Sequence, residues 1–142
     1  MELRNKAISE GRQKLVQTSE HYKKGLDILK QIDEENYEAI VDSFKQSIAP
    51  DLGVLAVEFN YGQIFSRPGL DLKSRLLATV AGLTALGNTQ QLKFYINGAQ
   101  NVGWTQEELI EVMMQMIIYS GFPNALNTIL PVAAEVFAER NK

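Results

Sequence analysis

Cysteine is absent from this chain of 142 residues, and histidine occurs once, at position 21. Without a thiol the protein cannot form a disulfide, hold a metal through thiolate ligands or reduce a peroxide. A single histidine has no second histidine or cysteine with which to bind a metal ion. We therefore expect His21 to be solvent exposed or to cap a helix. The composition therefore favours a protein without a metal or a cofactor.

Long hydrophobic runs are missing as well. No stretch approaches the ~20 apolar residues that a membrane-spanning helix needs, and the polar segment from Met1 to Gln17 does not resemble a secretory signal. The net charge is −3, with basic residues interspersed among acidic ones, which offers no patch for nucleic acid or an anionic membrane. We expect a cytoplasmic protein with neither of these partners.

Apolar residues recur along the chain at three- and four-residue steps, and no alternating run of β-branched residues exceeds a few positions. These patterns predict an all-α fold, a helical bundle in one domain, with N-terminal helices in residues 1–48 and a core in residues 49–142. The acidic cluster at residues 33–35 is expected to open a helix that ends before Pro50. Asp51 is expected to cap the next helix. The predicted inner face of that helix consists of residues that recur at three- and four-residue steps: Leu52, Leu55, Ala56, Phe59 and, at its far end, Ile64.

Two later helices carry clear boundary signals. Residues 72–86 are apolar on nearly every side, and Gly87 can end that helix in the left-handed conformation. Thr105 with Glu108 forms the pattern of a capping box. The helix that follows has one apolar stripe at Leu109, Val112, Met113, Met116 and Ile117. A second stripe, at Ile110, Met114 and Ile118, predicts contact with another subunit.

The segment from Gly62 to Arg75 joins two apolar helices through a turn. Pro68 biases Arg67 away from helical geometry, and Asp71 is placed to cap the helix that follows. Arg67 is thus expected on a rigid corner close to a helix N-terminus, which is a plausible place for an anion. The alternative is a plain helical corner whose arginines pair with carboxylates or carbonyls.

The sequence of this corner resembles the signature of the carboxymuconolactone decarboxylase family. The residues that carry the resemblance are Gly62-Gln63-Ile64-Phe65-Ser66-Arg67-Pro68-Gly69-Leu70-Asp71. Later blocks resemble the same family: Leu92-Lys93-Phe94-Tyr95, Gly103-Trp104-Thr105-Gln106-Glu107-Glu108-Leu109 and Tyr119-Ser120-Gly121-Phe122-Pro123. The resemblance implies the all-helical alkylhydroperoxidase-D-like fold in a homo-oligomer, commonly a trimer or hexamer. It also implies cofactor-free decarboxylation of a small carboxylated lactone in the breakdown of aromatic acids.

Such a reaction requires a grip on an anion, stabilisation of developing charge and one proton transfer. Arg67 and Arg75 suit the anion, with Tyr61 nearby in the sequence. The family usually has glutamate where this chain has Gln63 and histidine where it has Tyr95, so these two are the candidate catalytic residues. Glutamine cannot titrate and tyrosine is a poor base at neutral pH. A non-catalytic anion-binding or scaffold oligomer is therefore the alternative function.

Overall fold

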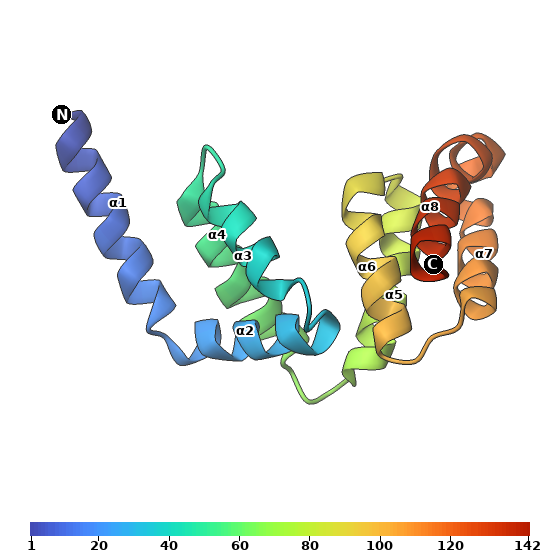
Figure 1. Ribbon diagram of the computed structural model, residues 1–142, viewed down its shortest axis with the longest axis horizontal. Coiled ribbons are helices and arrows are strands. Elements are labelled where there is room, and N and C mark those ends of the chain that lie inside the picture. Colours follow the sequence, from blue (N-terminus) through green and yellow to red (C-terminus); the bar gives the residue numbers. More distant parts are fainter. The chain divides into compact units, whose positions relative to one another are not determined.

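The computed structural model describes residues 1–142, which form helices and no strand. The all-α prediction is confirmed. The helices gather into two compact units, residues 1–69 and residues 70–142 (Figure 1). Whether the whole chain forms one domain, with its core in residues 49–142, stays a prediction.

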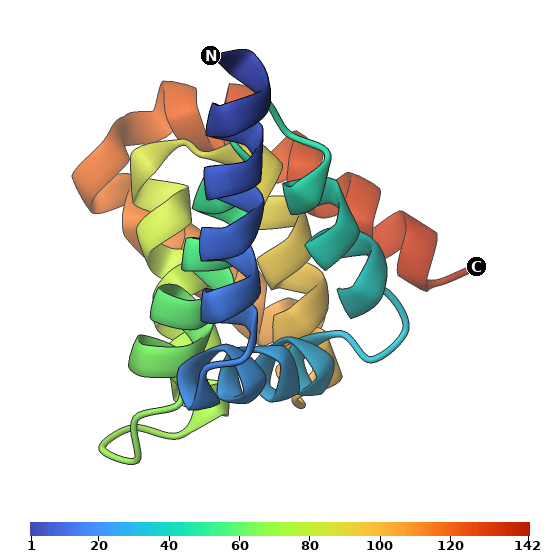
Figure 2. The ribbon, with the colours of Figure 1, turned by 90° about the vertical axis from the view of Figure 1, so that its left-hand side faces the viewer.

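The first unit contains four α-helices and a π-helical segment: α1 (Glu2–Gln17), α2 (Glu20–Ile32), α3 (Tyr37–Lys45), α4 (Pro50–Ala56) and η1 (Val57–Phe65). Helix α2 turns away sharply from the end of α1 (Figure 2). Its inner face is hydrophobic, with Leu29 and Ile32 fully buried. Segment η1 continues directly from α4, so residues 50–65 form one helical rod.

Two glycines allow α2 and η1 to approach closely. A Cβ atom at Gly25 on α2 would overlap the backbone carbonyl of Val57, and one at Gly62 on η1 would overlap the carbonyl of His21. Only glycine leaves room for backbone to meet backbone at this distance. His21 itself is solvent exposed, as the sequence predicts.

The predicted inner face of residues 50–65 is wrong. Leu52, Leu55 and Phe59 are 67%, 47% and 53% exposed. The buried residues are instead Gly53, Val54, Val57, Tyr61 and Gly62. The physical reason is that the face with glycines can reach α2 and α3, whereas the face with larger apolar side chains cannot approach them as closely.

The predicted starts of two helices are also corrected. Helix α4 begins at Pro50 with Ala49 as its N-cap, so Asp51 lies in the first turn and is not the cap. Asp33 does not open a helix. It follows the end of α2, is 5% exposed, and accepts hydrogen bonds from the backbone and side chain of Asn36 before α3 starts.

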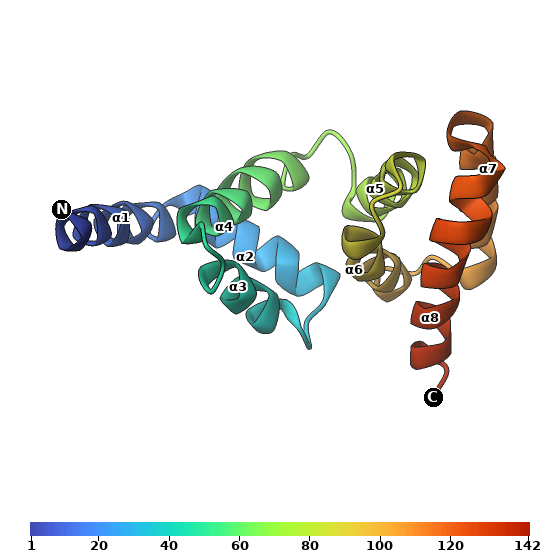
Figure 3. The same cartoon turned by 90° about the horizontal axis from the view of Figure 1, so that it is seen from above.

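The second unit contains α5 (Leu72–Leu86), α6 (Thr89–Asn101), α7 (Gln106–Asn124), the π-helical η2 (Ala125–Ile129) and α8 (Leu130–Arg140). Helix α5 packs against both α6 and α7, and α8 crosses and contacts α6 (Figures 1 and 3). The buried core side chains include Leu76, Val80, Leu92, Ile96, Leu109, Met113 and Ile129.

The boundary signals of this unit are confirmed. Gly87 ends α5 in the left-handed region, with φ 70°. Thr105 and Glu108 exchange side chain to backbone hydrogen bonds of 3.1 and 3.0 Å, a complete capping box. Local hydrogen bonds of this kind depend on residues three positions apart, which is why the sequence predicts them well.

Helix α7 presents a second apolar stripe to solvent. Leu109 and Met113 are buried, whereas Met114 and Ile118 are 50% and 77% exposed. Helix α7 breaks at Gly121, whose φ is 82°, and Phe122 beyond it is also exposed. No helix of the chain is long and apolar enough to cross a membrane.

Candidate functional site

We call residues 62–75, which contain Arg67 and Arg75, the arginine corner. This segment begins in the last turn of η1. Ser66 is the C-cap, and its hydroxyl donates a hydrogen bond to the carbonyl of Gly62. The backbone N–H of Arg67 donates to the Ile64 carbonyl at 3.2 Å, and Pro68 follows in the turn. The helix therefore ends before Arg67, as the proline predicts, and Arg67 itself is exposed.

The second unit begins where the corner leads into α5. The Asp71 carboxylate accepts the backbone N–H of Ser74 at 2.7 Å, which confirms it as an N-cap. That bond, together with the Ser74 hydroxyl and the nearby charge of Lys73, lowers the pKa of Asp71 from its ordinary value. The Nε–H of Arg75 donates a hydrogen bond to the Leu70 carbonyl at 3.0 Å. This bond stabilises the turn just before the N-terminus of α5.

Tyr61 and Gln63 lie on η1. Tyr61 is 4% exposed, and its ring lies 5.4 Å from that of Phe65 at an angle of 42°. Gln63 is half-buried. Single π-helical turns are rare and are frequent at functional sites, so the π-helical geometry of η1 is a structural signal that the sequence did not reveal.

Tyr95 lies on the inner face of α6. It is 8% exposed, and its ring meets the edge of the Phe94 ring at a centroid distance of 5.0 Å. Its neighbours on that face, Leu92, Ile96 and Ala99, are fully buried. Its hydroxyl can donate one hydrogen bond.

The predicted site residues fall into two sets. Tyr61, Gln63 and Arg67 lie on η1 and at its C-terminal end, within residues 1–69. Arg75 and Tyr95 lie on the neighbouring helices α5 and α6 of residues 70–142. The grouping of all five around one substrate stays a prediction.

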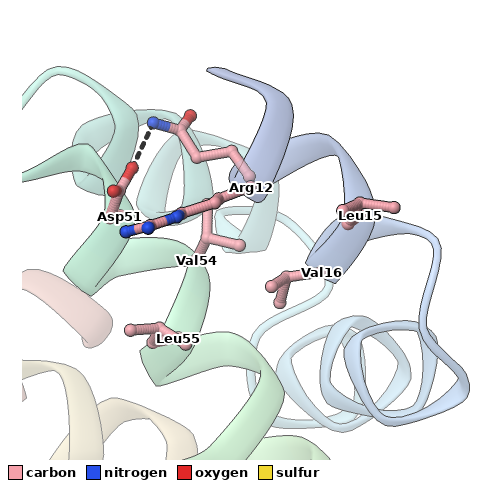
Figure 4. Close-up of a pocket in the computed structure, with 7 residues that line it drawn as sticks. Arg12, Leu15, Val16, Asp51, Val54 and Leu55 are labelled. Carbon is pink, nitrogen blue, oxygen red and sulfur yellow. Dashed lines mark hydrogen bonds between the residues drawn. The ribbon is translucent and has the colours of Figure 1, made fainter. Parts of the chain in front are cut away.

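A groove that the sequence did not predict lies between α1 and α4 (Figure 4). Its volume is about 330 Å³. The lining residues are Arg12, Gln13, Leu15, Val16, Asp51, Val54 and Leu55. The only sequence signal for this groove was a row of apolar and polar side chains near the end of α1. None of the residues of α1 is buried.

Comparison with known proteins identifies the family. The profile of the carboxymuconolactone decarboxylase family matches residues 50–135, from the first residue of α4 into α8. This chain belongs to the carboxymuconolactone decarboxylase family. The match includes the arginine corner and both helices that carry Arg75 and Tyr95, and α1 to α3 lie before it.

Three proteins with similar sequences are compared with this chain. A 4-carboxymuconolactone decarboxylase of Acinetobacter baylyi is 31% identical over 120 residues, which cover 84% of this chain and 89% of the relative. An uncharacterised 15.0 kDa protein of Paracoccus denitrificans is 32% identical over 68% of this chain and 73% of its own length. A nitrosuccinic acid decarboxylase of Metarhizium robertsii is 30% identical over 54% of this chain and 53% of its own length.

Proposed function

We propose that the chain is a decarboxylase that acts, without a cofactor, on a small anionic lactone or carboxylate. The observation that carries the proposal is the similarity to two proteins named as decarboxylases, whose named substrates both bear carboxylates. The exposed position of Arg67, after the end of η1, supports it, because a guanidinium can bind a carboxylate through two parallel hydrogen bonds.

The proposed roles follow from the chemistry of loss of carbon dioxide. The bond between the carboxylate carbon and the substrate breaks, carbon dioxide leaves, and the electron pair passes into the conjugated lactone. Arg67 and Arg75 bind the substrate carboxylates and stabilise that charge. Gln63 donates a hydrogen bond from its amide, and the Tyr95 hydroxyl delivers a proton to the lactone carbon that receives the electron pair.

Carbon dioxide release from γ-carboxymuconolactone tests this function. We expect turnover by the intact chain and a fall of roughly 10- to 100-fold in kcat/KM in Arg67→Ala, because a charged hydrogen bond is lost. Arg4→Ala, which removes an exposed arginine on α1, is the matched control and should retain activity. Absence of turnover by the intact chain would contradict the proposed reaction.

Tyr95→Phe removes the hydroxyl and keeps the aromatic ring, so it distinguishes the role of the hydroxyl from that of the ring. The ring is buried, so phenylalanine keeps its packing and the thermal midpoint should change little. If the hydroxyl delivers the proton, kcat falls while KM stays nearly constant. A variant that loses stability and activity together would indicate a structural tyrosine.

The second candidate function is an anion-binding protein without catalysis. It is favoured by Gln63, which cannot titrate, and by Tyr95, in place of the usual acid and base of the family. Calorimetric titration with a small dicarboxylate distinguishes the two. Binding that Arg67→Ala abolishes, without release of carbon dioxide from the lactone, would establish the second function.

We also propose that the protein is a cytoplasmic homo-oligomer. A trimer or a hexamer is expected, because the resemblance to the carboxymuconolactone decarboxylase family implies these assemblies. The exposed stripe of α7, with Met114 and Ile118, supports self-association because exposed apolar residues in a row favour burial against another subunit. Ile118→Asp should shift the mass measured by light scattering toward that of a monomer. A monomeric mass for the unaltered protein at micromolar concentration would refute the oligomer.

A further inference from the structure

The groove between α1 and α4 has an apolar floor and a polar end. Val54 forms the floor and is 2% exposed, while Leu15 and Leu55 line it with 74% and 47% of their surfaces exposed. At the polar end, the Asp51 carboxylate accepts hydrogen bonds from Ser9 at 2.6 Å and from Gln13 at 2.5 Å. These bonds tie α1 to α4, so the groove has two fixed walls.

Arg12 supplies a positive charge at this polar end. Its side chain extends from α1 toward Asp51 across the groove (Figure 4). Its charge contributes, after the hydrogen bonds from Ser9 and Gln13, to the lowered pKa of Asp51. Ser9 and Gln13 both donate to the same oxygen of that carboxylate, Oδ1. Arg12 lines the groove, and although the charge of Asp51 lies nearby, no carboxylate of the chain forms a salt bridge with the Arg12 guanidinium, which carries five N–H donors.

We propose that this groove binds a small monocarboxylate with a compact apolar body. The carboxylate accepts two hydrogen bonds from the Arg12 guanidinium, and the apolar body covers Val54, Leu15 and Leu55. A second carboxylate at the other end of the ligand would lie against the apolar side chains of the groove, which is unfavourable. The groove thus selects a different class of anion from the carboxylated lactone of the proposed function.

The groove shares no residue with the arginine corner, although Asp51, Val54 and Leu55 lie in the part of the chain that matches the family profile. Helix α1 lies before residue 50, where the similarity to the family profile begins. Arg12 and the apolar residues of α1 are therefore features of this chain outside the matched region. The inference stands on the groove alone and does not depend on the decarboxylase proposal.

An NMR titration with 4-phenylbutyrate tests the inference, with 4-phenylbutanol as the neutral ligand of matched size. A ligand of about a dozen heavy atoms in an open groove should bind with a Kd on the order of 1 mM. We expect methyl signals of Leu15, Val16, Val54 and Leu55 to shift with the carboxylate and to shift far less with the alcohol. Absence of shifts in these methyl groups at several millimolar would overturn the proposal.

Three variants identify the charge that binds. Arg12→Gln should weaken binding of 4-phenylbutyrate by about tenfold, whereas Arg4→Gln on the same helix should leave it unchanged. Asp51→Asn keeps an oxygen acceptor for Ser9 and Gln13 but removes the negative charge, so binding should strengthen. Equal binding by the two arginine variants would refute the role of Arg12.

Arg67→Ala separates this site from the arginine corner. It should bind 4-phenylbutyrate as the unaltered protein does, whatever its effect on the lactone. If Arg67→Ala abolishes binding and Arg12→Gln does not, the carboxylate binds at the corner and the groove is not its site.

Discussion

Replacing Gly25 by alanine should destabilise the protein, although alanine is the better helix former. The substitution gains about 1 kcal/mol of helix propensity. Against this, the new methyl group would overlap the backbone carbonyl of Val57, and its contact with a Val57 side-chain carbon would be 3.1 Å. A backbone carbonyl cannot rotate away as a flexible side chain does, so α2 and η1 must separate.

Overpacking of this kind costs about 3 kcal/mol at the upper end of its usual range, so the net loss is about 2 kcal/mol. Urea denaturation followed by circular dichroism measures it, and the thermal midpoint should fall by roughly 5–10 °C. Gly82→Ala in α5 is the matched control, because nothing lies within 4 Å of a Cβ atom there. That variant should be stabilised by up to about 1 kcal/mol.

If Gly25→Ala is as stable as the unaltered protein while Gly82→Ala gains stability, the overlap costs only about 1 kcal/mol, and α2 and η1 separate more easily than their backbone contact predicts. A similar gain in both variants would refute the close approach altogether. Gly62→Ala provides an independent check, because its Cβ atom would overlap the His21 carbonyl on the other side of the same contact.

Three further predictions concern the core, a cap and pH. Leu76→Ala should cost about 3 kcal/mol in urea denaturation, because Leu76 is fully buried and a cavity would remain. Thr105→Ala should cost about 1 kcal/mol, and Thr105→Ser should restore most of it, because serine can accept the same hydrogen bond. The folded-state pKa values of Asp51 and Asp71 are lowered, so these carboxyls stabilise the fold at neutral pH and lose that contribution as pH falls below about 4. Stability measured at pH 7 and pH 3 should therefore differ less in Asp71→Asn than in the unaltered protein.

The candidate site was predictable where it depended on neighbours in the chain. Proline at position 68 and aspartate at position 71 fixed the corner, and the structure has Arg67 exposed there, after the end of η1. The burial of Tyr95 followed from its spacing with Leu92 and Ile96. The π-helical form of η1 and the groove beside Arg12 could not be predicted, because each depends on contacts between helices.

The sequence by itself determined both ends of α5 and the start of α7, since a cap such as Asp71 or Thr105 is satisfied by a backbone group three residues away. Only the tertiary structure decided which face of residues 50–65 is buried. Counting apolar residues favoured the face of Leu52 and Phe59, but burial follows the distance at which a partner helix can pack. Glycines on α2 and η1 reduce that distance on the opposite face, and a pattern within one helix does not contain this information.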